Sequence, residues 1–128
     1  MAWREVGTAK TTAKHFGIFR SECLKWIGIF GLTDWHIEVK HKAHRGDALA
    51  SIWSDTVNRL AYLYLEPDWG TDDITEERLR LSAFHEVCEV LVTPLNICAR
   101  SRFISESEID EATHIIVRTL ENVLYPKY

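Results

Sequence analysis

The sequence has few of the features that mark the specialised classes of protein. Proline occurs three times and glycine six times in 128 residues, and the glycines are scattered rather than grouped in a phosphate-binding loop. Apolar runs such as residues 90–92 are far shorter than the roughly 20 residues that cross a bilayer. The hydrophobic fraction of 46% and the charged fraction of 27% are those of an ordinary globular protein. These values argue against a fibre, a low-complexity linker and a membrane protein, and the length predicts a single domain over residues 1–128.

Cysteine is also scarce. The three cysteines, Cys23, Cys88 and Cys98, form no CxxC pair. The first ten residues carry charge and no apolar core of the kind that a signal peptide needs. Because an odd number of cysteines without an export signal is typical of proteins whose thiols stay reduced, we expect a cytoplasmic protein.

Clustered positive charge is missing as well. The chain has 15 basic and 19 acidic residues, for a net charge of −4, and it contains no lysine or arginine run. This is not the electrostatic footprint of a nucleic-acid-binding protein, so we do not expect a nucleic acid as partner. A weaker alternative, a nucleic-acid-associated factor, would use Lys40, Lys42 and Arg45.

Hydrophobic periodicity divides the chain into helical and extended segments. Apolar residues three and four positions apart predict a helix over residues 11–30, which Gly31 ends. Alternating apolar residues predict three strands, over residues 34–42, 48–54 and 59–66. The last of these is apolar on both faces, so we expect both of its faces to be covered. The order α-β-β-β-α-α predicts an α+β domain whose strands form an antiparallel meander with helices packed on it.

Capping patterns and a proline set the limits of the two later helices. Asp73, with Glu76 three residues on, predicts the start of the first of them, and Pro94 predicts its end. A loop is expected to follow. Ser105 and Glu108 form a second capping box, which predicts a last helix that runs to about residue 124.

The most informative segment is residues 81–92, whose apolar residues point nearly all round the helix axis and predict a buried helix. It nevertheless contains His85, Glu86 and Glu89. Burying an ionised carboxylate without a partner costs several kcal/mol, and no lysine or arginine lies within this run. His85 and Glu89 lie one turn apart on one face, as in an HExxH metal helix whose second histidine is replaced by glutamate. A divalent metal, with Zn²⁺ as the first choice, would neutralise the charge. The alternative is a partly exposed helix whose glutamates reach solvent.

A catalytic zinc site takes three protein ligands, and the last helix offers candidates for the third. We expect His114 to be that ligand, because it restores a set of two histidines and one carboxylate. Asp110 and Glu121 lie on the same flank and would hydrogen-bond its ring. Asp110 or Glu121 as the ligand itself, or a solvent-facing His114, remain as alternatives.

A second group of metal-binding side chains is weaker. His36, His41 and His44 lie around the first turn of the expected sheet and could hold a metal. Histidines exposed in a turn are the more common explanation of such a group.

The order of elements and the motif resemble the minimal core of the zincin metallopeptidases. The likeness is greatest to small SprT-like and IrrE-like proteins and to short phage or prophage proteins of that type. The likeness in the order of elements covers nearly the whole chain, and the matching segments are residues 35–39, 59–65, 83–89 and 111–118. The chain departs from the family pattern at Glu89, where the family has histidine, and at His114, where it usually has glutamate. For a phage-encoded chain, the expected compartment is the host cytoplasm.

The resemblance implies a metal-dependent peptidase. In it, His85, Glu89 and His114 hold the metal and Glu86 is the general base toward the attacking water. The third strand would offer an edge to an extended peptide or protein substrate. The alternative is a non-catalytic regulatory or binding protein of phage type that keeps the fold.

Overall fold

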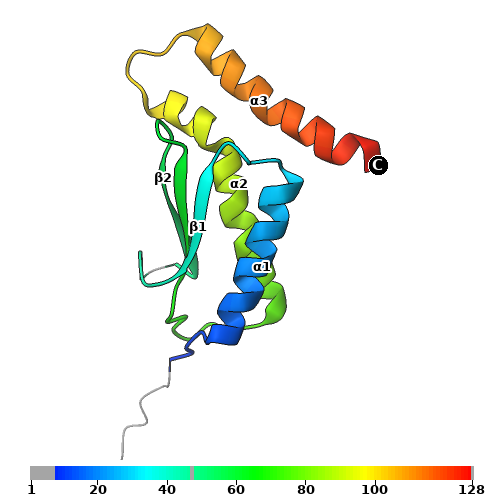
Figure 1. Cartoon of the computed structure of the whole chain (residues 1–128). Coiled ribbons are helices and arrows are strands. Elements are labelled where there is room, and N and C mark those ends of the chain that lie inside the picture. Colours follow the sequence, from blue (N-terminus) through cyan, green and yellow to red (C-terminus); the bar gives the residue numbers. More distant parts are fainter. Residues whose placement is uncertain (1–7, 47, 128) are drawn as a thin grey trace, which may run out of the picture.

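A computed structural model describes residues 8–46 and 48–127 and shows an α+β arrangement of three helices and one open sheet (Figure 1). The elements are α1 (Ala13–Ile29), β1 (His36–His41), β2 (Ala50–Asp55), β3 (Leu60–Leu65), α2 (Glu76–Arg100), α3 (Glu106–Leu124) and the 3₁₀ turn η1 (Tyr125–Lys127). Each predicted helix and strand is present, and the α+β class is confirmed. Within the described residues, no helix combines the length and apolarity that a bilayer-spanning segment needs.

The expected antiparallel meander is wrong, because the sheet is mixed. Its strand order is β1-β3-β2, with β1 parallel to β3 and β2 antiparallel to β3. The loop from β1 to β2 therefore crosses the end of β3 instead of forming a tight hairpin. Glu66, directly after β3, explains this path. Its carboxylate accepts hydrogen bonds from three successive N–H groups of the crossing loop, those of His44, Arg45 and Gly46.

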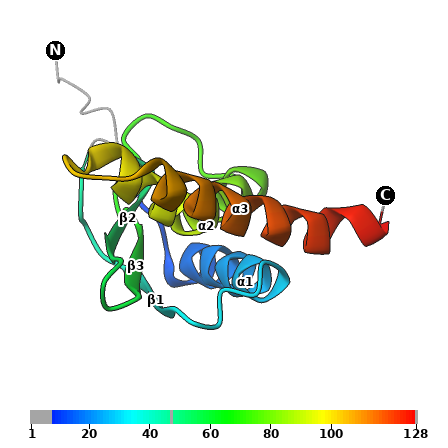
Figure 2. The same cartoon turned by 90° about the horizontal axis from the view of Figure 1, so that it is seen from above.

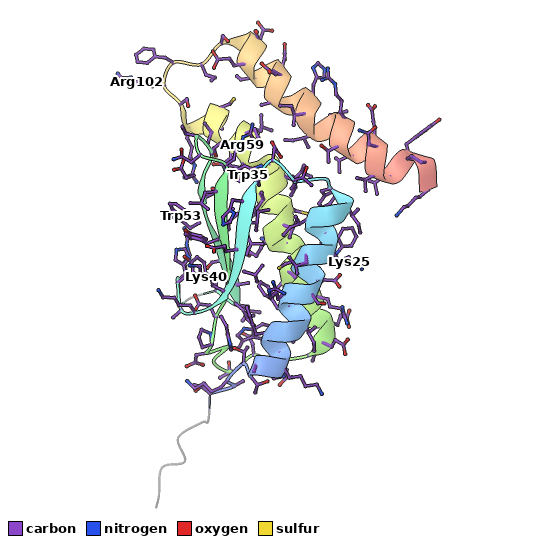
Figure 3. The ribbon with its side chains drawn as sticks, in the orientation of Figure 1. Lys25, Trp35, Lys40, Trp53, Arg59 and Arg102 are labelled. Carbon is purple, nitrogen blue, oxygen red and sulfur yellow. The ribbon has the colours of Figure 1, made fainter. Side chains whose placement is uncertain are left out.

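The two faces of the sheet differ. On the helix side, Ala61, Leu63 and Leu65 are fully buried beneath α1 and α2, which lie side by side (Figures 1 and 2). On the other side, the alternate residues of β3 are only half-buried. There, Trp53 stacks on Tyr62 with ring centroids 5.2 Å apart. Figure 3 shows Trp53 and Lys40 on this face, away from the helices. The expectation that both faces are covered therefore holds for the helix side, while side chains alone shield the other.

Helices α1 and α2 form the second layer of the core. Phe19 and Cys23 of α1 are fully buried, and Trp26 packs edge-on against Phe84 of α2 with centroids 4.6 Å apart. A buried carboxylate, Glu22, ties the two helices together. It accepts hydrogen bonds from the Arg80 guanidinium at 2.8 Å and from the Trp26 indole at 2.8 Å. The packing holds α2 firmly against the sheet, which matters because α2 carries the candidate site.

The limits of α2 differ from the sequence prediction at both ends. Its N-cap is Thr75, whose hydroxyl accepts a hydrogen bond from the Arg78 N–H at 3.1 Å, and not Asp73. The helix also continues through Pro94 to Arg100. A proline inside a helix costs about 3 kcal/mol, because it removes one backbone hydrogen bond and crowds the preceding turn. The extra turns bury Cys98 against the start of α3.

Helix α3 begins as the sequence predicts, with the Ser105 hydroxyl accepting from the Glu108 N–H at 3.2 Å. It lies across one end of the sheet-and-helix unit and extends beyond α1 (Figures 1 and 2). Only Ala112 of α3 is buried, whereas Ile109 and Leu120 of its apolar stripe are 39% and 37% exposed. The helix therefore buries little of its apolar stripe, although Val123 near its C-terminal end also packs against the core.

Candidate metal centre

A cleft of about 530 Å³ lies between β2 and α2. Ala50, Ile52 and Ser54 of β2 line one wall, and a long face of α2 lines the other. Ser51, from the opposite face of β2, also lines the cleft, so the cleft borders the strand's edge. Among the described strands β2 pairs with β3 alone, which leaves its other edge toward the cleft. The prediction that the third strand offers the edge is wrong, because β3 is the central strand.

His85, Glu86 and Glu89 meet in this cleft. One ligand atom from each lies within 4.8 Å of the other two. Glu86 is buried at 4% exposure, while His85 and Glu89 are exposed. The helical spacing explains the convergence, since residues one and four positions apart share a flank of the helix. An imidazole and two carboxylates are a donor set that Zn²⁺ and other divalent cations accept.

The Glu86 carboxylate is poorly satisfied. Its Oε2 is buried and has no hydrogen-bond partner in the structure. Burial, followed by the adjacent Glu89 carboxylate, raises the pKa of Glu86 to about 8, against a weaker opposing effect of the Arg45 charge. An unpartnered buried oxygen beside a second carboxylate and an imidazole is the environment that a bound cation would complete. The residues present therefore fit a divalent metal.

His114 does not belong to this cluster. It is exposed on α3, as are Asp110 and Glu121, and none of the three is among the side chains that converge with His85 in the described structure. The sequence could not reveal this, because the path of α3 depends on the continuation of α2 through Pro94. The expected third ligand is thus not brought into place, and Glu86 occupies the third position of the cluster instead.

The second histidine group is dispersed. The His41 ring lies 2.7 Å from the Thr11 hydroxyl and stacks on Phe16. The His44 ring lies 2.9 Å from the Ser51 hydroxyl and stacks on Tyr64. His36 lies near Glu38 at 3.8 Å. In the part of the chain that the structure describes, these histidines form no metal cluster.

Two cleft residues have no role in the sequence analysis of the metal site. Arg45 reaches the cleft from the crossing loop and Arg100 from the last turn of α2. Arg45 could not be assigned to the site from the sequence, because it lies 41 positions before Glu86. Arg100 could not be assigned to the site either, because the sequence predicts that the helix ends at Pro94.

Comparison with known proteins supplies no relative. The chain matches no protein-family model, no curated protein and no solved structure. The geometry of the cleft is therefore the basis on which a function can be proposed for this chain.

Proposed function

We propose that the chain is a metal-dependent peptidase of zincin type, in which His85 and Glu89 supply two of the ligands of a divalent cation and Glu86 is the general base; a third protein ligand is not among the side chains that converge there in the described structure. The observation that carries the proposal is the buried, unpartnered Oε2 of Glu86 beside the other two side chains. Burial raises the pKa of this carboxyl to about 8, and a cation bound beside it would stabilise the charged form that a general base or a ligand needs. Bound there, a divalent cation would lower the pKa of water and polarise a scissile carbonyl.

The chain's own residues supply the remaining functions. Glu86 lies in the cleft wall, where it can take a proton from a water that attacks a substrate in the cleft. The free edge of β2 offers backbone N–H and C=O groups to an extended peptide, which would add to the sheet as a further strand. The cleft would hold that peptide against the face of α2 that carries Glu86.

A second candidate function follows from one specific observation. Because Glu86 lies within 4.8 Å of both other donor atoms, it is placed to be a third ligand instead of a base. Such a site has three protein ligands and no base, and the protein would then be a non-catalytic metal-binding or regulatory protein.

Glu86→Gln separates these two functions. The protein is purified without a histidine tag or chelator, and its metal content is measured by elemental analysis. The peptidase proposal expects about one zinc per chain in both proteins, with hydrolysis of a protein digest reduced about 10²–10⁴-fold in the variant. Loss of the metal from Glu86→Gln would establish the second function. Glu77→Gln, an exposed glutamate in the first turn of the same helix, is the matched control.

Absence of metal would overturn both functions. Zinc that binds only the folded protein raises its stability, by about 2.7 kcal/mol at a hundredfold excess over the dissociation constant. Under both proposals, zinc should raise the melting temperature of the wild type and should leave that of His85→Ala unchanged. A wild type that neither retains metal nor responds to zinc, manganese or iron would contradict them.

A further inference from the structure

The cleft holds two positive charges besides the candidate metal centre. Arg45 and Arg100 both line it, and neither forms an ion pair with a described residue. Several other arginines are paired, namely Arg59 with Asp34, Arg78 with Asp72, and Arg80 with Glu22 and Glu76. A guanidinium group without a partner presents a planar set of donors that matches a carboxylate.

Arg45 is held in position by its backbone. Its N–H donates to the Glu66 carboxylate at 2.6 Å, and the N–H groups of His44 and Gly46 donate to the same oxygen at 2.9 and 3.1 Å. Arg45 belongs to the end of the cleft where the candidate metal centre lies. Its loop is bound to Glu66 at the end of β3. The adjoining start of β2, Ala50, lines a small pocket together with His85 and Glu86. A fixed loop can present this charge to a ligand with little loss of conformational entropy.

Arg100 lies at the other end. It follows His85 by 15 residues on α2, which corresponds to about 22 Å along a helix. An extended chain advances about 3.3 Å per residue, so six residue steps span roughly 20 Å. Side chains an even number of positions apart point to the same face of a strand. Between the two ends, Ile52, Val92 and Ile97 give the cleft an apolar middle.

We propose that the cleft selects an extended acidic peptide of about seven residues, whose carboxylate side chains near its two ends bind Arg45 and Arg100. That the occupant of the cleft is a peptide rests on the proposed function. Charge complementarity supports it, because a divalent cation at the candidate centre would offset the charges of Glu86 and Glu89. The two arginines then give the occupied cleft a net positive charge.

The test is a binding measurement on the full chain with saturating zinc. Fluorescein-labelled heptapeptides are compared by anisotropy: one with Asp at both ends and five alanines between, one with Asp at a single end, and one with Asn at both ends. We expect the first to bind at least tenfold more tightly than the third, with the second between them. Because exposed charges are screened by salt, the difference should shrink between 50 and 500 mM sodium chloride.

Arg100→Gln is the deciding variant. It should reduce the affinity for the doubly acidic peptide to that for the singly acidic one while leaving zinc binding unchanged, since Arg100 is remote from His85 along α2. Arg20→Gln, an exposed arginine of α1, is the matched control and should change neither. Equal affinity for the acidic and Asn peptides, or an unchanged preference in Arg100→Gln, would overturn the proposal.

The outcome is distinguishable from failure of the proposed function. Zinc binding and loss of hydrolysis in Glu86→Gln, with no preference for acidic peptides, would leave the peptidase and remove its selectivity. A preference for acidic peptides that depends on Arg100 but needs no zinc would keep the acidic occupant and remove the metal-dependent function.

Discussion

Two buried glutamates, Glu66 behind the crossing loop and Glu86 in the cleft, have opposite environments. Glu66 is 2% exposed, and one of its oxygens accepts three backbone N–H groups. Glu86 is 4% exposed, and its Oε2 has no hydrogen-bond partner among the described residues. Burial would raise the pKa of each, but the backbone donors outweigh burial at Glu66 and its pKa lies below the usual value. At Glu86, burial prevails and the neighbouring Glu89 adds to it.

The difference separates a structural charge from a functional one. Glu66 completes the fold, since it binds the loop that carries the chain from β1 across β3 to β2. Three backbone N–H groups of the chain satisfy Oε1 of this carboxylate. Glu86 has no such set of backbone donors, so burial and the neighbouring Glu89 keep it largely protonated near neutral pH, and a cation in the cleft would stabilise its charged form.

The largest expected effect comes from removing the satisfied carboxylate. Glu66→Ala should lower the free energy of unfolding by about 3 kcal/mol, because three N–H groups lose a charged acceptor. Glu66→Gln keeps an acceptor oxygen and should lose about half as much. Urea denaturation measures both. Unchanged stability in Glu66→Ala would show that the crossing loop does not depend on this carboxylate.

Removing the charge of Glu86 should stabilise the metal-free protein, in contrast to the changes at Glu66. In metal-free protein at pH 8, Glu86→Gln should raise the free energy of unfolding by about 1–2 kcal/mol, since the amide carries no charge to bury. If the wild type binds zinc more tightly than Glu86→Gln does, then zinc should make the wild type the more stable of the two proteins. A Glu86→Gln variant that is destabilised as strongly as Glu66→Gln would remove the contrast between the two residues.

The free energy of unfolding should depend on pH through the ionisation of both Glu66 and Glu86. The folded-state pKa of Glu86 is raised, so its contribution is fully present below the unfolded value near 4.5 and is lost as the pH rises toward about 8. The folded-state pKa of Glu66 is lowered, so its contribution is present above 4.5 and is lost as the pH falls. Metal-free protein should therefore be most stable near pH 5, and stability should decline above it by at most about 1.4 kcal/mol per pH unit.

The matching variants assign the two limbs of this profile. Thermal unfolding of metal-free Glu86→Gln should lose the decline between pH 5 and 8 and keep the acid limb. Glu66→Gln should weaken the acid limb alone. A decline above pH 5 that survives in Glu86→Gln would have another origin.

Local patterns in the sequence predict the elements but not the order of the strands. Alternation gives β1, β2 and β3 nearly correctly, yet it is the same for a meander and for the observed mixed sheet. The apolar character of residues 59–66 on both faces is the one local sign that β3 is central. The crossing loop depends on a contact between Glu66 and residues about 20 positions earlier, which periodicity cannot reveal.

The candidate site divides in the same way. The helical spacing of His85, Glu86 and Glu89 predicts a cluster that the structure shows, because helix geometry alone fixes it. Groups that reach the cleft from other elements, such as Arg45, are placed by tertiary structure, so helix geometry cannot predict them. Likewise, the expected role of His114 accompanied the prediction that the preceding helix ends at Pro94, whereas α2 continues to Arg100 and packs Cys98 against α3.

The smallest expected effect therefore belongs to His114. Because His114 is exposed and lies outside the cluster, His114→Ala should change the free energy of unfolding by no more than about 0.5 kcal/mol. It should also leave the zinc-induced rise in melting temperature intact, whereas His85→Ala should abolish it. Differential scanning calorimetry with and without zinc measures both quantities in each variant. Equal loss of the zinc response in His114→Ala and His85→Ala would mean that α3 moves toward the cleft when metal binds, and the three residues of α2 would then not be the whole site.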